Sequence, residues 1–135
     1  MKGRSVTTGS YWTARRTTLR TGMEAEYERI HARIPSALAD SLRENGVLSW
    51  HIWRDGQFLF HHIETSRPYD TVIDDLESSS SPLPEWEFTM SQLLDPARDS
   101  DIRLRSVWRL DENGQSNGVS PHTDPRSGAW RDSTL

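Results

Sequence analysis

The segment VLSWHIWRDGQFLFHHIE, residues 47–64, constrains the fold more than any other part of the chain. Two runs rich in aromatic and β-branched residues flank an Asp-Gly pair, a pattern that favours two antiparallel strands joined by a tight turn. Alternation along the first strand places Trp50 and Ile52 on one face and His51 and Trp53 on the other. The second strand alternates in the same way, so that one face carries Phe58, Phe60, His62 and Glu64 and the other carries Leu59, His61 and Ile63. The alternation alone does not tell which face meets the core.

The residues before this hairpin have the periodicities of a strand and then of a helix. The segment YWTARRTTLR, residues 11–20, is rich in aromatic and β-branched residues and favours a strand, in which Arg15 or Arg16 should point inward. From residue 23 to residue 42 apolar side chains recur every three or four positions, which predicts a helix that ends near Gly46. Pro35 lies inside this helix and has no N–H for the carbonyl of residue 31, so we expect a kink there.

The residues after the hairpin predict two more helices and one more strand. Helical spacing is found in residues 67–77 and 85–95, with Pro96 ending the second helix, and the serines and prolines of residues 78–84 predict a loop between them. The segment IRLRSVWRLD, residues 102–111, alternates strictly and predicts a final strand. Residues 112–135 are rich in Gly, Ser, Asn, Asp and Pro and predict a disordered tail, in which Trp130 has no explanation.

The predicted element order, β-α-β-β-α-β, is that of the split βαβ or ferredoxin-like folds of the α+β class. We therefore expect one domain over residues 11–111, a flexible lead-in over residues 1–10, and a four-stranded antiparallel sheet with helices on one face. The other face of the sheet stays bare although the hairpin carries aromatic residues on both sides. Two such sheets facing each other would form a dimeric α+β barrel, so we expect a homodimer.

The composition excludes several classes of function. The net charge is −4 with acidic and basic residues interspersed, so no basic stripe indicates a nucleic-acid partner. No apolar run approaches the roughly 18–20 residues of a membrane span, and no signal-peptide pattern is present, so we expect a cytoplasmic protein. The chain has no cysteine, which excludes disulfides, thiol catalysis and cysteine-ligated zinc.

The segment EYERIHARIP, residues 26–35, contains the first candidate site residues. Tyr27 and His31 are four positions apart and share one face of the predicted helix. Two interpretations remain open from the residues alone: a buried helix face with satisfied polar tips, or a pair that moves protons. His61 and His62 point to opposite faces and cannot bind one metal together. Pairing with His51 is the one arrangement that could hold a metal, and we predict no metal site. Trp50 and Trp53 are either core or interface residues or platforms for a sugar ring.

An ordered set of motifs resembles the L-rhamnose mutarotase family over roughly residues 12–111. These motifs are TGMEAEYERIHARIPSAL, the hairpin SWHIWRDGQFLFHHIE, the helix EWEFTMSQLL and the closing LRSVWRLD. The resemblance implies a dimeric α+β barrel that interconverts the α and β anomers of a hexose or deoxyhexose without a cofactor or metal. It also implies that His31 is the catalytic acid/base and that Tyr27 lies beside it.

The resemblance is incomplete at the positions that line the sugar site. Trp86 matches the first residue of the family's Trp-Trp pair, whereas Glu87 occupies the second position. The family's tryptophan before the kink proline is also missing, since Ile34 is followed directly by Pro35. A pocket specific for rhamnose is therefore not supported. The expected substrate-binding residues are Trp86, Trp50, Trp53 and His62.

The chemistry of mutarotation suits these residues. The reaction needs a group that takes the proton of the anomeric hydroxyl and returns one to the ring oxygen, and a histidine with a pKa near its usual value of about 6.5 can do both at neutral pH. Two other functions remain open. One is a non-catalytic sugar-binding dimer, and the other is a monooxygenase acting on haem or aromatic compounds, in which a helix-borne histidine would bind the haem.

Overall fold

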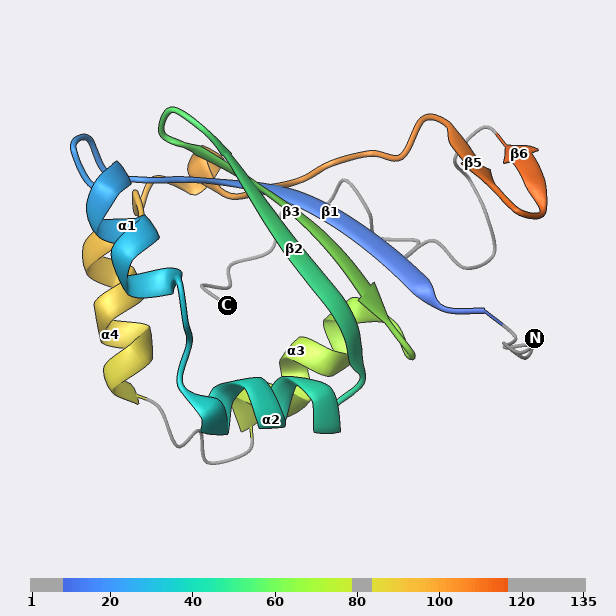
Figure 1. The fold of residues 1–135 in the computed structure, drawn as a ribbon, viewed down its shortest axis with the longest axis horizontal. Helices are drawn as coiled ribbons and strands as arrows, with labels where there is room; N and C mark the ends of the chain where they lie inside the picture. The colour runs from blue at the N-terminus through green and yellow to red at the C-terminus, as the bar shows by residue number, and fades with distance from the viewer. Residues whose placement is uncertain (1–8, 79–83, 117–135) are drawn as a thin grey trace.

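A computed structural model of the chain describes residues 9–78 and 84–116, and within these ranges the fold is the predicted α+β, ferredoxin-like one. Four strands form one antiparallel sheet in the order β2-β3-β1-β4, and the helices all lie on one side of it (Figure 1). The elements of this layered unit are β1 (Tyr11–Thr18), α1 (Glu24–His31), α2 (Ser36–Glu44), β2 (Val47–Asp55), β3 (Phe58–Thr65), α3 (Tyr69–Ser78), α4 (Pro84–Leu93), a 3₁₀ turn (Arg98–Ser100) and β4 (Ile102–Arg103).

The hairpin of β2 and β3 forms as its sequence predicts. The turn itself is Gly56-Gln57, since Asp55 ends β2 and pairs with Phe58 of β3. Gly56 has a φ of +60°, a conformation in which a Cβ atom is unfavourable. The structure also answers which face is inward. Trp50 and Ile52 pack against the two apolar clusters under the helices, whereas His51 and Trp53 lie exposed on the opposite face.

The predicted helix over residues 23–45 is two helices and not one kinked helix. Residues 32–35 separate α1 from α2, and Pro35 stands at the N-cap of α2 with extended backbone angles of −56° and 140°. A proline disfavours helical geometry in the residue before it as well as removing a donor, so the chain breaks here. The break makes His31 the last residue of α1.

Two separate apolar clusters join the helices to the sheet. One lies under α2 and α3, and its buried members are Val47, Ile63, Tyr69, Val72, Ile73 and Leu76. The other lies under α1 and α4, and its buried members are Leu19, Tyr27, Leu59, Met90 and Leu93. On β3 the inward residues of the two clusters, Leu59 and Ile63, are separated by His61. A polar row therefore crosses the sheet between two apolar regions.

The predicted strand over residues 102–111 is wrong for most of its length. Only Ile102 and Arg103 pair with β1, and the amide of Leu104 donates the last bond, at 2.8 Å, to the carbonyl of Ala14. Residues 104–108 are irregular, and β5 (Arg109–Asp111) then pairs with β6 (Gly114–Ser116) in a two-stranded arm that extends away from the sheet (Figure 1). Alternation predicted extended chain correctly but could not show which strand it would pair with.

Part of the predicted tail is ordered in this arm. Residues 112–116 complete the β5–β6 hairpin, so the prediction of disorder from residue 112 is wrong for them. Residues 1–8, most of the predicted loop at 78–84, and residues 117–135 with Trp130 lie outside the described residues. Among the helices of the described part, none is long and apolar enough to cross a membrane.

Candidate functional site

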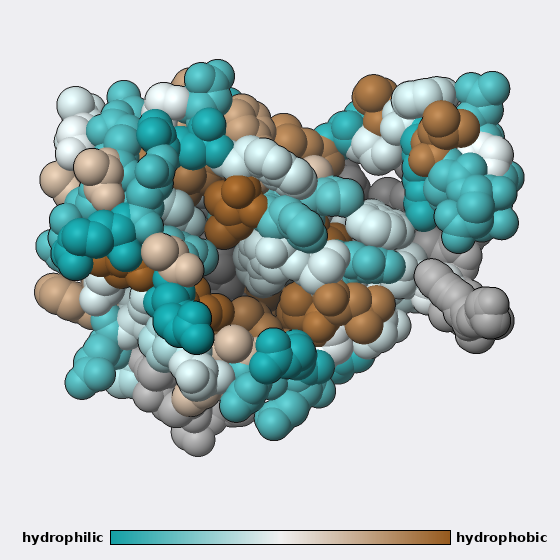
Figure 2. All heavy atoms as spheres, in the orientation of Figure 1, coloured by the Kyte–Doolittle hydropathy of each residue, from teal (hydrophilic) through white to brown (hydrophobic). Residues whose placement is uncertain are grey.

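The residues of the predicted Tyr-x-x-x-His pair are in contact at the end of α1. The rings of Tyr27 and His31 stack with their centroids 4.9 Å apart and an interplanar angle of 26°. Trp86 of α4 approaches His31 edge-on, with the ring centroids 5.4 Å apart. Figure 2, in the orientation of Figure 1, shows a hollow in the surface between the helices and β2. The three side chains thus form an aromatic corner with a titratable ring in its centre.

Burial sets the protonation states of this corner. It raises the pKa of the Tyr27 phenol, which therefore stays protonated throughout the neutral range. It lowers the pKa of His31, although a hydrogen bond with the residue's own backbone opposes this effect. At neutral pH the pair is accordingly a phenol that can donate and a neutral imidazole that can accept a proton.

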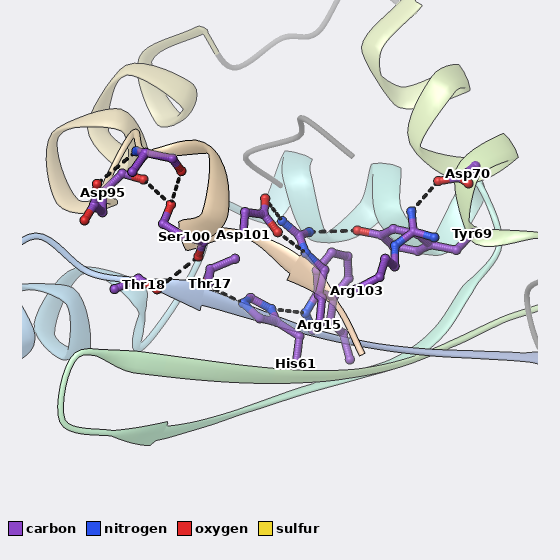
Figure 3. Close-up of polar contacts among 12 residues, drawn as sticks. Arg15, Thr17, Thr18, His61, Tyr69, Asp70, Asp95, Ser100, Asp101 and Arg103 are labelled. Carbon is purple, nitrogen blue, oxygen red and sulfur yellow. Dashed lines mark hydrogen bonds and ion pairs between the residues drawn. The ribbon is translucent and has the colours of Figure 1, made fainter. Parts of the chain in front are cut away.

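A row of hydrogen-bonded polar side chains crosses the inner face of the sheet next to this corner (Figure 3). Arg15 is buried on β1, and its Nη1 donates to the Tyr69 hydroxyl at 2.8 Å. Its Nη2 donates to Oδ2 of Asp101 at 2.8 Å, which forms an ion pair with one partly exposed partner. The positive charge of Arg15 opposes the effect of burial on Tyr27 and lowers the pKa of its phenol.

A second ion pair lies at the α3 end of this polar row. Arg103 of β4 binds Asp70 of α3, and both side chains are buried. The Arg103 guanidinium also lies over the ring of Tyr69, 4.9 Å from its centroid. Tyr69 is therefore held between two arginines, one at its hydroxyl and one at its ring, which fixes it within the buried core.

His61 lies in the middle of the polar row and both of its ring nitrogens are engaged. Trp50 Nε1 donates to His61 Nδ1 at 3.0 Å, and His61 Nε2 lies 2.9 Å from the Thr17 hydroxyl. An indole N–H can only donate, so Nδ1 is the acceptor and the proton of the neutral ring is on Nε2. Burial lowers the pKa of His61 well below its usual range, and the charge of Arg15 and, when it is protonated, that of His31 lower it further. His61 is thus a neutral structural group and not a proton carrier.

The structure brings four of the six predicted site residues to the inner face. Tyr27, His31 and Trp86 form the aromatic corner, and Trp50 points to the same side from β2. Trp53 and His62 do not join them. Both lie on the outer face, where their rings are 6.4 Å apart, because they alternate with the inward residues of their strands. Grouping Trp53 and His62 with His31 in one site is therefore wrong within a single chain.

Sequence reasoning missed the members of the polar row. Arg15 was expected to point inward as one of two arginines, but its partners Tyr69 and Asp101 lie far from it in the sequence and carry no motif. His61 was known to alternate with His62, and only the face remained undecided. One feature of the sequence does point to the polar row: Leu59, His61 and Ile63 share one face of a strand, and His61 is the one polar residue among them.

The histidines of the hairpin do not form a metal site with their neighbours. Within residues 9–78 and 84–116, no group of three or more histidine, aspartate or glutamate side chains is placed to hold a metal ion. His51 and His62 are directly opposite each other on the outer face, whereas His61 faces the helices.

The fold and the inner cleft define a class of protein: a ferredoxin-like α+β domain that holds a tyrosine, a histidine and tryptophans on the helix side of its sheet. Comparison with family models identifies the class more closely. The model of the family described as L-rhamnose mutarotase matches residues 13–112, and the chain belongs to this family. A comparison with curated proteins gives no significant match.

Proposed function

We propose that this protein is a mutarotase that interconverts the α and β anomers of a hexose or deoxyhexose, with L-rhamnose as the first candidate. The observation that carries the proposal is the contact of Tyr27, His31 and Trp86 in a chain whose family model is that of L-rhamnose mutarotases. This corner supplies a base, a hydrogen-bond donor and an apolar wall within the reach of one sugar ring.

His31 is the acid/base of the proposed reaction. Its neutral imidazole takes the proton of the anomeric hydroxyl while the bond between C1 and the ring oxygen breaks, and C1 becomes an aldehyde. The same proton then returns to the former ring oxygen, which is now a hydroxyl. Rotation about the C1–C2 bond and the reverse transfer close the ring as the other anomer. The cycle consumes nothing and leaves His31 neutral, so one positioned histidine is sufficient.

The other residues of the cleft hold the sugar. The Tyr27 phenol, whose pKa is raised by burial, donates a hydrogen bond to a sugar oxygen as the ring opens. Trp86 and Trp50 provide flat apolar surfaces for the C–H face of the ring. Glu87 stands where the family has its second tryptophan and is exposed on α4, so the proposed cleft has one aromatic wall fewer there. For this reason the identity of the sugar must be measured.

The proposed assembly is a homodimer in the cytoplasm. The outer face of the sheet exposes large aromatic side chains, with Trp53 56% exposed and Phe58 41% exposed. Covering this face with a second copy would remove them from water, while the helix-side cleft would stay within each protomer.

Exchange NMR on the purified protein with free L-rhamnose, L-fucose, D-galactose, D-glucose and D-ribose tests the proposal. The expected result is faster exchange between the α and β anomeric signals of at least one deoxyhexose or hexose than in buffer. Binding of a sugar without faster exchange would contradict the proposed activity and favour the sugar-binding dimer. Unchanged exchange and no binding across the panel would contradict both.

A further inference from the structure

Trp50 of β2 is held on the inner face of the sheet by a single directed hydrogen bond. Its indole N–H is the only polar group of its side chain, and it donates to His61 Nδ1 at 3.0 Å. The rest of the ring is restrained by edge contacts, with its centroid 6.0 Å from that of His61 and 6.2 Å from that of Tyr69. The angle of the indole on the inner face of the sheet therefore depends on an acceptor at the position of His61 Nδ1.

His61 can serve as this acceptor because its other nitrogen is also fixed. The Nε2–H donates to the Thr17 hydroxyl at 2.9 Å, which keeps the proton away from Nδ1. The cross-strand neighbour of His61 is Arg15, whose positive charge opposes protonation of the ring. On α1, a protonated His31 acts in the same direction. A doubly protonated ring would point an N–H at the indole N–H and break the contact.

We propose that His61 is a positioning residue that orients Trp50 as the apolar platform of the sugar site. This inference rests on the proposed function and extends it to a residue outside the Tyr27–His31 pair. Because the only donor of Trp50 is already committed to His61, the indole meets the sugar through its ring alone. The substrate must then present a face of C–H groups, and not a hydroxyl in need of a partner, to this wall of the cleft.

Two amide variants separate the roles of the two ring nitrogens. In His61→Asn the side-chain oxygen takes the place of Nδ1 and can still accept from Trp50, while the contact with Thr17 is lost. In His61→Gln the amide takes the place of Nε2 and keeps the contact with Thr17, while the acceptor for Trp50 is lost. His61→Leu removes both contacts. All three are compared with the parent protein on the sugar that it exchanges.

The readouts are KM, kcat and the indole ¹H–¹⁵N resonance of Trp50, assigned with Trp50→Phe. We expect His61→Asn to keep the KM of the parent protein and a downfield indole resonance. We expect His61→Gln and His61→Leu to raise KM by about tenfold, the loss associated with one hydrogen bond, with little change in kcat. In both variants the indole resonance should move upfield.

Equal behaviour of the Asn and Gln variants would overturn the inference, as would an unchanged indole resonance in His61→Leu. A fall in kcat with unchanged KM would also overturn it, because that result would place His61 in the proton transfer. If the parent protein exchanges no sugar, the proposed function fails, whereas the indole resonances in the same samples still decide whether His61 orients Trp50.

Discussion

His61 and His62 are adjacent in the chain, yet the two faces of the sheet give them different states. His61 is 5% exposed, and each of its ring nitrogens has a side-chain partner at about the length of an ordinary hydrogen bond. His62 is exposed on the outer face, where its ring stacks on Trp12 with the centroids 4.8 Å apart. His61 is therefore held by directional hydrogen bonds, whereas His62 is held by ring stacking.

The difference shows what the helix layer does to polar side chains. A buried polar group without a partner is costly, so the inner face selects arrangements in which the donors and acceptors match. Water satisfies the polar atoms of the outer face, so its aromatic and histidine rings need only stack. We therefore expect chemistry that needs fixed donors and acceptors on the inner face of the sheet. On the outer face we expect contact with another protein surface.

The neighbouring arginines Arg15 and Arg16 extend the comparison and give the largest expected effect on stability. Arg15→Met removes a buried guanidinium from Asp101 and Tyr69, and we expect a loss of about 2–4 kcal/mol in the free energy of unfolding, since Asp101 is partly exposed. Arg16, which lies over the ring of the exposed Phe58 on the outer face, is the matched control. Arg16→Met should cost less than about 1 kcal/mol.

Urea denaturation of the two variants measures both losses. Equal losses would contradict the difference between the faces, because they would show that the buried network contributes no more than an exposed contact.

Acid should weaken the fold through the inner histidines. Burial lowers the pKa of His61 in the folded protein, so below its ordinary value of about 6.5 the unfolded chain binds a proton that the folded chain does not. The stability that His61 contributes as a neutral buried group is fully present above this pH and is lost as the pH falls. The free energy of unfolding then changes by at most about 1.4 kcal/mol per pH unit for one group. His31, whose pKa is also lowered, adds to the slope.

The matched variants His61→Asn and His62→Asn test the assignment of this slope. Urea midpoints between pH 7.5 and about pH 5 should depend less on pH in His61→Asn than in the parent protein. The pKa of His62 is lowered as well, but its ring is exposed, so His62→Asn should keep most of the slope. If the pH dependence of the urea midpoint disappears only in His62→Asn, a histidine of the outer face causes it and the assignment to His61 is wrong.

The β5–β6 arm should give the smallest effect. Truncation after Glu112 removes β6, which pairs with β5 in a sheet of its own, and the contact of Trp108 Nε1 with Gln115. Because neither belongs to the two apolar clusters, we expect a loss below about 1 kcal/mol, measured by thermal unfolding. A large fall in melting temperature would show that residues 113–135 support the core.

Local pattern was sufficient to predict the fold but not the partners of its polar residues. The β2–β3 hairpin, the alternation of its strands and the spacing of Tyr27 and His31 are local, and each is found as predicted, although the turn is Gly56-Gln57 and Asp55 ends β2. The break at Pro35 was placed correctly but underestimated, because the proline also constrains the residue before it. Residues 104–111 were read as one strand because alternation describes extended chain whether or not a partner strand is present.

The positions of the candidate site residues were predictable to the same extent and for the same reason. Tyr27 and His31 are one helical turn apart, so their contact follows from spacing. Arg15 contacts Tyr69 and Asp101 across 54 and 86 residues, and no periodicity in the sequence brings these three together. The choice between His61 and His62 depended on which face the helices cover, a tertiary property that alternation leaves open.

The rate of anomer exchange in His31→Ala, compared with that in His51→Ala, shows whether His31 is the acid/base. Both variants remove one histidine, the first from the inner cleft and the second from the outer face. On the sugar that the parent protein exchanges, we predict that His31→Ala lowers the enzymatic rate by about 10²–10⁴-fold with an unchanged circular dichroism spectrum, while His51→Ala keeps the parent rate. A folded His31→Ala variant that exchanges anomers as fast as the parent protein would contradict the account and place the chemistry elsewhere.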